Sequence, residues 1–130
     1  MSWDALALAF AFSHLAGDFL FQTEWQAMTK ERGLGRDPRA RRALFTHVLT
    51  YLVAFVPALV WLSTDLGAGW TIGIAALIAA PHLIVDDRRL VGIWLRRVKG
   101  AVEPDAMLLM LVDQSVHLLC LLGAALLATG

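Results

Sequence analysis

The sequence predicts an all-α integral membrane protein, a four-helix bundle built from two helical hairpins. Hydrophobic residues make up 58% of the 130 residues and the mean hydropathy is +0.65, whereas soluble proteins contain about 45–50% apolar residues. The apolar residues also gather into four segments, each close to the roughly 20 residues that a membrane-spanning helix needs. A chain of this length is expected to form one domain, here a single transmembrane domain over residues 1–130.

The four predicted spans cover residues 3–22, 43–62, 70–86 and 106–128. Each span is expected to be helical, because a backbone inside lipid must satisfy its own hydrogen bonds. A stretch rich in Gly, Pro and Arg, residues 31–42, is typical of a loop between the first two spans. Residues 90–98 have one apolar face and are predicted to form a short interfacial helix on the membrane surface. An inward extension of the third span is the alternative for this segment.

The basic residues predict how the spans are oriented. All eleven lie in two loops, six between the first and second spans and five between the third and fourth. The loop over residues 63–69 and both ends of the chain have none. The positive-inside rule therefore places both basic loops in the cytoplasm and both termini outside. The expected location is the inner (cytoplasmic) membrane, with membrane lipid as partner. The net charge of zero predicts no nucleic-acid partner.

The predicted spans contain all four histidines and three aspartates, and most of these residues are paired at helical spacing. The pairs are His14 with Asp18, His82 with Asp86, and Asp113 with His117. Residues four apart share one face of a helix. An Asp at the centre of a span costs roughly 2.5–3.5 kcal/mol on insertion scales, so these carboxylates need a partner, water or a cation.

The directions of the spans bring the pairs to one depth. The first and third spans run inward and have His before Asp, whereas the fourth runs outward and has Asp before His. All three aspartates are therefore expected on the cytoplasmic side of their histidines, with the histidine of the second span near their level. We expect seven side chains to meet there: His14, Asp18, His47, His82, Asp86, Asp113 and His117.

Imidazole and carboxylate groups together predict a divalent metal ion. Zinc is the first expectation, and iron and manganese also suit these ligands. Seven ligands exceed the four of a tetrahedral zinc, so a two-metal site is open. The lone Cys120 excludes a cysteine-rich metal site. The alternative is a metal-free network of His–Asp pairs that joins the helices.

Other polar residues near this level are candidates for catalysis and substrate binding. Asp113 is the predicted general base, and the predicted substrate-binding residues are Gln22, Arg88, Arg89 and Gln114. Gln22 continues the stripe of the first pair, and Gln114 adjoins the general base. Arg89 lies seven residues after His82 and hence on its face, where it can bind an anionic headgroup.

The motifs HLAGDFLFQTEW, HLIVDDRR and DQSVH, with His47 opening the second span, resemble those of a family of small bacterial multi-pass membrane proteins. This family is the domain of unknown function thirty-three-oh-seven. The resemblance covers essentially the whole chain and implies fold and membrane location, because the family's activity is unassigned. More distantly, the repeated His-x-x-x-Asp pattern is similar to that of predicted membrane-bound metal-dependent hydrolases.

Three functions are compatible with the sequence, and whether the protein is an enzyme is left open. The first is a metal-dependent hydrolase acting on an anionic or lipid-linked substrate at the cytoplasmic leaflet, through a cavity open to that side. The second is a metal-ion or proton transporter or relay, because buried His and Asp residues mark ion pathways. The outer half offers few polar residues for such a path, unless subunits of a homo-oligomer form one. The third is a non-catalytic membrane subunit with a structural His/Asp network.

Overall fold

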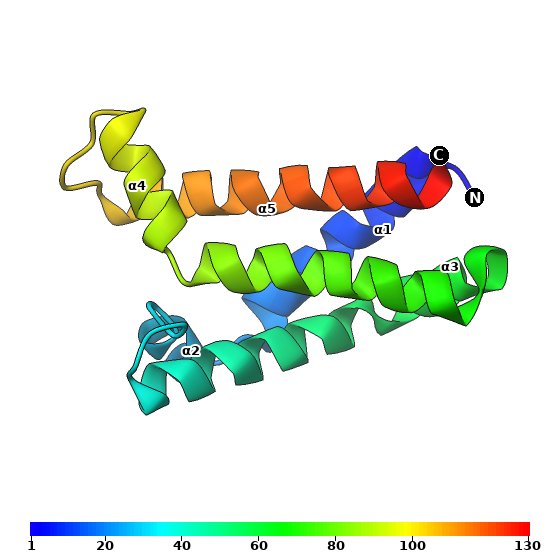
Figure 1. Ribbon diagram of the computed structural model, residues 1–130, viewed down its shortest axis with the longest axis horizontal. Helices are drawn as coiled ribbons and strands as arrows, with labels where there is room; N and C mark the ends of the chain where they lie inside the picture. Colours follow the sequence, from blue (N-terminus) through cyan, green and yellow to red (C-terminus); the bar gives the residue numbers. More distant parts are fainter.

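The computed structural model describes residues 1–130, and it is entirely helical outside its loops. Helices hold 82% of the residues and there are no strands. The elements in chain order are α1 (Trp3–Leu15), η1 (Ala16–Phe21), α2 (Glu24–Thr29), α3 (Pro38–Asp86), α4 (Arg89–Arg97) and α5 (Ala106–Thr129). Figure 1 shows α5 and two arms of α3 along the long axis, α1 crossing them at an angle, and both termini at one end. The predicted all-α class is confirmed.

Three helical stretches are long and apolar enough to cross a membrane. They are Trp3–Phe21, Pro38–Asp86 and Ala106–Thr129. The second has 49 residues and doubles back on itself (Figure 1), because Gly67 inside it has φ 76° and ψ 168°, a conformation essentially confined to glycine. The sequence predicted a loop over residues 63–69. Helical hydrogen bonding instead continues up to both sides of the reversal, since one glycine is enough to turn the chain.

The first arm of α3 begins earlier than the predicted residue 43. Pro38 occupies the first turn, where its missing N–H costs nothing, and Asp37 caps the helix by accepting a 2.9 Å hydrogen bond from the Arg39 backbone N–H. The predicted loop over residues 31–42 is correspondingly shorter. The short helix α2 precedes it and was not predicted, although Thr23 and Gln26 form a reciprocal capping box at its start.

The helix predicted over residues 90–98 is present as α4. Arg88 adopts a left-handed conformation with φ 63° between α3 and α4, so the alternative of an uninterrupted extension of the third span is wrong. The position of α4 at a membrane surface stays a prediction.

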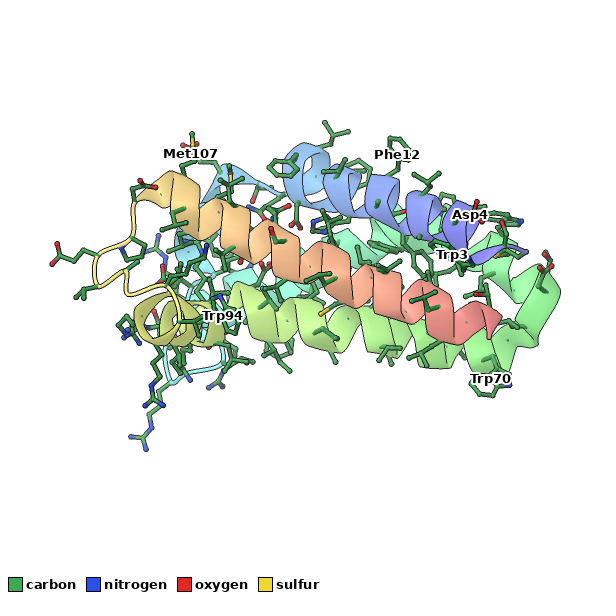
Figure 2. All side chains as sticks on the ribbon, turned by 90° about the horizontal axis from the view of Figure 1, so that it is seen from above. Trp3, Asp4, Phe12, Trp70, Trp94 and Met107 are labelled. Atoms are coloured by element: carbon green, nitrogen blue, oxygen red, sulfur yellow. The ribbon has the colours of Figure 1, made fainter.

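The half of the molecule near the termini is filled by apolar side chains, and much of its outer surface is apolar too. A buried cluster of twelve residues, which we call the apolar plug, comprises Leu6, Phe10, Tyr51, Phe55, Ala58, Leu62, Ile74, Ile78, Leu121, Ala124, Ala125 and Ala128. Figure 2 shows Phe12 pointing away from the helices, Trp3 and Trp70 near the terminal end, and Trp94 at the opposite end. Exposed apolar surface on this scale is unusual for a soluble monomer and is typical of a lipid-facing helix.

A candidate metal centre

The structure brings all seven predicted ligands into one buried cluster. They come from α1, η1, both arms of α3, and α5. None of them exposes more than 9% of its surface: His14, Asp18, His47, His82, Asp86, Asp113 and His117. Helical spacing places each His–Asp pair on one face, and the packing of the helices then turns those faces toward each other. The cluster lies on the basic-loop side of the apolar plug.

Four of the ligand atoms are spaced as if around one point. The Nε2 atom of His47 lies 3.0 Å from Nε2 of His82, 3.4 Å from Oδ1 of Asp18 and 3.0 Å from Oδ2 of Asp86. Nε2 of His82 lies 3.5 Å and 3.2 Å from the same two oxygens. Ligands about 2.0–2.2 Å from a tetrahedral ion are about 3.3–3.6 Å apart. These five distances are therefore close to those between the ligands of one shared divalent ion.

A second group is formed by Asp86, Asp113 and His117, whose ligand atoms all lie within 4.8 Å of one another. Nδ1 of His117 is 3.0 Å from the backbone carbonyl oxygen of Asp113, so it donates a hydrogen there. Its Nε2 then carries a lone pair, as metal-binding imidazoles do. This Nε2 faces Oδ1 of Asp86 at 3.7 Å, and with a neutral imidazole and an ionised carboxylate neither atom has a hydrogen to donate to the other.

Several of these buried atoms have no hydrogen-bond partner. They include Oδ1 of Asp18, Oδ1 of Asp113 and Nε2 of His117. Buried polar atoms are nearly always paired, so three unpartnered acceptors in one cluster indicate a cation or water between them. The residues present therefore fit a divalent ion by both spacing and chemistry.

His14 differs from the other three histidines because both of its ring nitrogens have partners. Nε2 lies 2.9 Å from Oε1 of Gln114, and Nδ1 lies 3.1 Å from the Tyr51 hydroxyl. The Gln114 amide nitrogen donates to Asp18 at 3.1 Å and to Asp113 at 3.2 Å, which turns its oxygen toward the imidazole. Gln114 thus links one histidine and two carboxylates, and Tyr51 donates to the same histidine.

Lys30 is a member of the cluster that the sequence did not predict. Its side chain is buried, and its Nζ donates to Oδ2 of Asp86 at 2.7 Å and to Oε1 of Gln22 at 2.8 Å. The loop that carries it is fixed to the end of α3 by two backbone N–H groups, that of Arg32 to the Asp87 carbonyl (3.2 Å) and that of Leu34 to the Asp87 carboxylate (2.8 Å). The spacing of residues along the chain does not indicate that this loop contacts the end of α3.

Tyr51 is a second unpredicted member. Its ring stacks on His82 with centroids 3.5 Å apart and planes at 13°, while its hydroxyl reaches His14. It follows His47 by four residues, so it lies on the face that carries that histidine. The same spacing rule that selected the His–Asp pairs would have found it.

Asp18 lies in η1, where the helix is of the π type rather than the predicted α type. Such segments are rare and occur frequently at functional sites. Gly17 lies directly against Tyr51, since a Cβ atom added there would stand 2.5 Å from Cδ2 of the ring. The missing side chain allows η1 and α3 to approach closely enough for Asp18 to reach His47 and His82.

The two predicted arginines lie beside the cluster and not in it. They line a cavity of about 480 Å³ at the basic end, together with Glu31, Arg32, Gly92, Ile93, Arg96, Pro104 and Leu109. Arg89 pairs with Asp87 at 3.3 Å, and Arg88 with Glu31 at 3.7 Å. We call this cavity the arginine cavity. Its link to the metal centre is Arg89, whose partner Asp87 directly follows Asp86 in the chain.

Comparison with known proteins agrees with the resemblance seen in the motifs. No curated protein and no solved structure matches the chain. Residues 6–130 match the family described as "Protein of unknown function (DUF3307)". This match includes every residue of the candidate centre and nearly the whole chain, and the protein therefore belongs to the DUF3307 family.

Proposed function

We propose that this protein is a membrane-embedded, metal-dependent hydrolase that acts on an anionic or lipid-linked substrate at the cytoplasmic leaflet. The observation that carries the proposal is the buried set of four ligand atoms from His47, His82, Asp18 and Asp86, in which each imidazole nitrogen lies 3.0–3.5 Å from the other three atoms. Buried carboxylates are costly unless a cation neutralises them. Lys30 supplies only one positive charge against three aspartates.

The proposal includes a topology of four membrane crossings, two of them made by the arms of α3. The support is that all eleven basic residues belong to the loops, the short helices and the first turns of α3, at one end of the molecule, while both termini lie at the other end (Figure 1). In this arrangement α4 lies along the inner surface, the two termini are outside, and the metal centre sits in the inner half of the membrane.

The chemistry divides between a metal ion and side chains of this chain. A divalent ion in the cluster would supply Lewis-acid chemistry and activate water. Asp113 acts as general base, because Gln114 holds its Oδ2 while its Oδ1 has no partner. The attacking water gives its oxygen to the substrate and a proton to Asp113, which passes that proton to the leaving group.

The arginine cavity is the proposed substrate-binding surface. Its four arginines face one glutamate, which favours an anionic group, and Ile93 and Leu109 provide an apolar wall for a lipid chain. Gln22 accepts a hydrogen bond from Lys30, which also donates to Asp86, and we assign Gln22 a further contact to the substrate. The apolar plug fills the opposite half of the molecule, which disfavours a transport path through it.

Elemental analysis of the protein purified in mild detergent tests metal binding. We expect at least one equivalent of a divalent metal, and its loss when His47→Ala and His82→Ala are combined. Ser115→Ala is the matched control, because that hydroxyl bonds only to the Leu111 carbonyl on its own helix and metal content should not change. If the unaltered protein contains no metal and takes none up, the proposal fails and the metal-free network is the correct interpretation.

Hydrolysis is tested separately with a chromogenic phosphate ester and the Asp113→Asn variant. We expect turnover to fall by about 10²–10⁴-fold, the usual contribution of a general base, while the metal content stays at that of the unaltered protein. Turnover that is unchanged by this substitution would remove Asp113 from the mechanism.

A further inference from the structure

The carboxylate of Asp86 stands between two sets of imidazoles and presents a different oxygen to each. Its Oδ2 lies 3.0 Å from Nε2 of His47 and 3.2 Å from Nε2 of His82. Its Oδ1 lies 3.7 Å from Nε2 of His117. A carboxylate with ligand groups at both oxygens has the arrangement of a bridge between two ions.

A single ion does not provide a partner for every unpartnered atom of the cluster. An ion among His47, His82, Asp18 and Asp86 gives a partner to Oδ1 of Asp18, which otherwise has none. It leaves Nε2 of His117 and Oδ1 of Asp113 without partners on the other side of Asp86. His14 cannot form a hydrogen bond with either of these atoms, because its two ring nitrogens already pair with Tyr51 and Gln114.

We infer that the metal centre consists of two subsites of unequal affinity that share Asp86, and that the weaker subsite is filled together with a phosphate ester. This inference rests on the proposed function. The tight subsite has four protein ligands, His47, His82, Asp18 and Asp86. The weak subsite has Oδ1 of Asp86 and Nε2 of His117, with Asp113 adjoining as base, and so keeps positions open for water and substrate. Ions in such paired sites are about 3.5–4 Å apart, a separation that one carboxylate spans.

The charges of the cluster explain the difference in affinity. The three aspartates carry three negative charges and Lys30 carries one positive charge. The net charge of the metal-free cluster is therefore −2. The first divalent ion balances this charge, with the histidines neutral. A second divalent ion creates a surplus of two positive charges in a buried site, which is unfavourable unless an anion enters with it. A phosphate ester supplies that charge, and it places oxygens where the weak subsite lacks protein ligands.

Titration of the metal-free, detergent-purified protein with Mn²⁺, with and without inorganic phosphate, tests the inference. We expect two equivalents, and we expect phosphate to tighten the second by about tenfold without affecting the first. His117→Ala should remove the second equivalent and the phosphate effect, and His82→Ala should weaken the first. Ser115→Ala, two residues from His117 on the same helix, should retain both.

Electron paramagnetic resonance of the unaltered protein gives a readout that needs no substitution. At two equivalents of Mn²⁺ we expect the spectrum of a magnetically coupled pair. The spectrum of isolated ions, or a single equivalent at saturating Mn²⁺ and phosphate, would overturn the two-subsite inference and leave the proposed metal binding intact. Absence of any Mn²⁺ binding would overturn both.

Discussion

At the scale of single residues, Gly17 controls how closely η1 approaches the first arm of α3. An added Cβ would lie 2.5 Å from Cδ2 and 3.3 Å from Cα of Tyr51, so neither ring nor backbone can yield without moving α3. We expect Gly17→Ala to lower the free energy of unfolding by about 1–3 kcal/mol, the usual cost of overpacking. Chemical unfolding in detergent measures it. Gly73→Ala is the control, because nothing lies within 4 Å of its Cβ position, and it should be neutral or slightly stabilising.

Lys30 is the only basic side chain that touches the metal centre. Replacing it by methionine leaves Asp86 with two neutral imidazoles, and removing one partner of a buried ion pair costs about 3–5 kcal/mol. We expect Lys30→Met to destabilise the metal-free protein by an amount of this order, and Lys99→Met, at an exposed position, to have little effect. In an Asp86→Asn background the cost of Lys30→Met should shrink. Equal costs in both backgrounds would show that the ion pair contributes nothing.

At the scale of elements, the reversal of α3 depends on one residue. Gly67 has φ 76° and ψ 168°, where a side chain is strained by about 1–3 kcal/mol. Thermal unfolding in detergent should therefore show Gly67→Ala to be destabilised by that amount. Gly69→Ala, two residues on, has open space around its Cβ position and no left-handed backbone, so it should lie within about 0.5 kcal/mol of the unaltered protein. Equal melting of the two variants would contradict the conformation at Gly67.

Element boundaries were predictable only where hydropathy changes along the chain. The predicted spans over residues 3–22 and 106–128 agree closely with Trp3–Phe21 and Ala106–Thr129, since polar residues flank both. The start of α3 was missed because Arg39, Arg41 and Arg42 resemble a loop in a hydropathy profile, while Pro38 and the Asp37 cap permit a helix. The π character of η1 was missed because the apolar pattern of this segment is the same as that of an α-helix and leaves no separate periodic signal.

The candidate centre was largely predictable, because its members are tied by spacing within each helix. Residues four apart stay on one face whatever the tertiary fold, so the three His–Asp pairs could be read from the sequence. In α5 the aspartate precedes the histidine. Because the fourth span was predicted to run in the opposite direction, this reversed order was expected to bring Asp113 and His117 to the same depth as the other two pairs. Lys30 could not be found in this way, since its burial depends on contacts that Asp87 makes with a loop more than 50 residues away in sequence.

At the scale of the whole molecule, the proposed orientation can be tested by cysteine labelling in intact cells. In a Cys120→Ser background, Ala68→Cys places an exposed thiol at the reversal of α3, and Arg36→Cys places one in the loop that precedes α3. A membrane-impermeant maleimide should label position 68 from outside and position 36 only after permeabilisation, because the positive-inside rule retains the arginine-rich end in the cytoplasm. The reverse pattern would invert the topology and move the arginine cavity to the outer surface.

The π-helical segment also restricts how the length of this chain can vary. Deleting one residue from a regular α-helix rotates the following chain by about 100°, whereas a π turn holds one extra residue, so deleting one residue between Ala16 and Phe21 would restore α-type bonding and leave the following chain in nearly the same orientation. Because Asp18 lies inside the shortened segment and His14 lies before it, the separation of these two residues in sequence would have to change for both to keep their partners. A sequence aligned to this chain with a one-residue gap at η1 should therefore carry its carboxylate at a shifted position, or lack the first half of the metal centre.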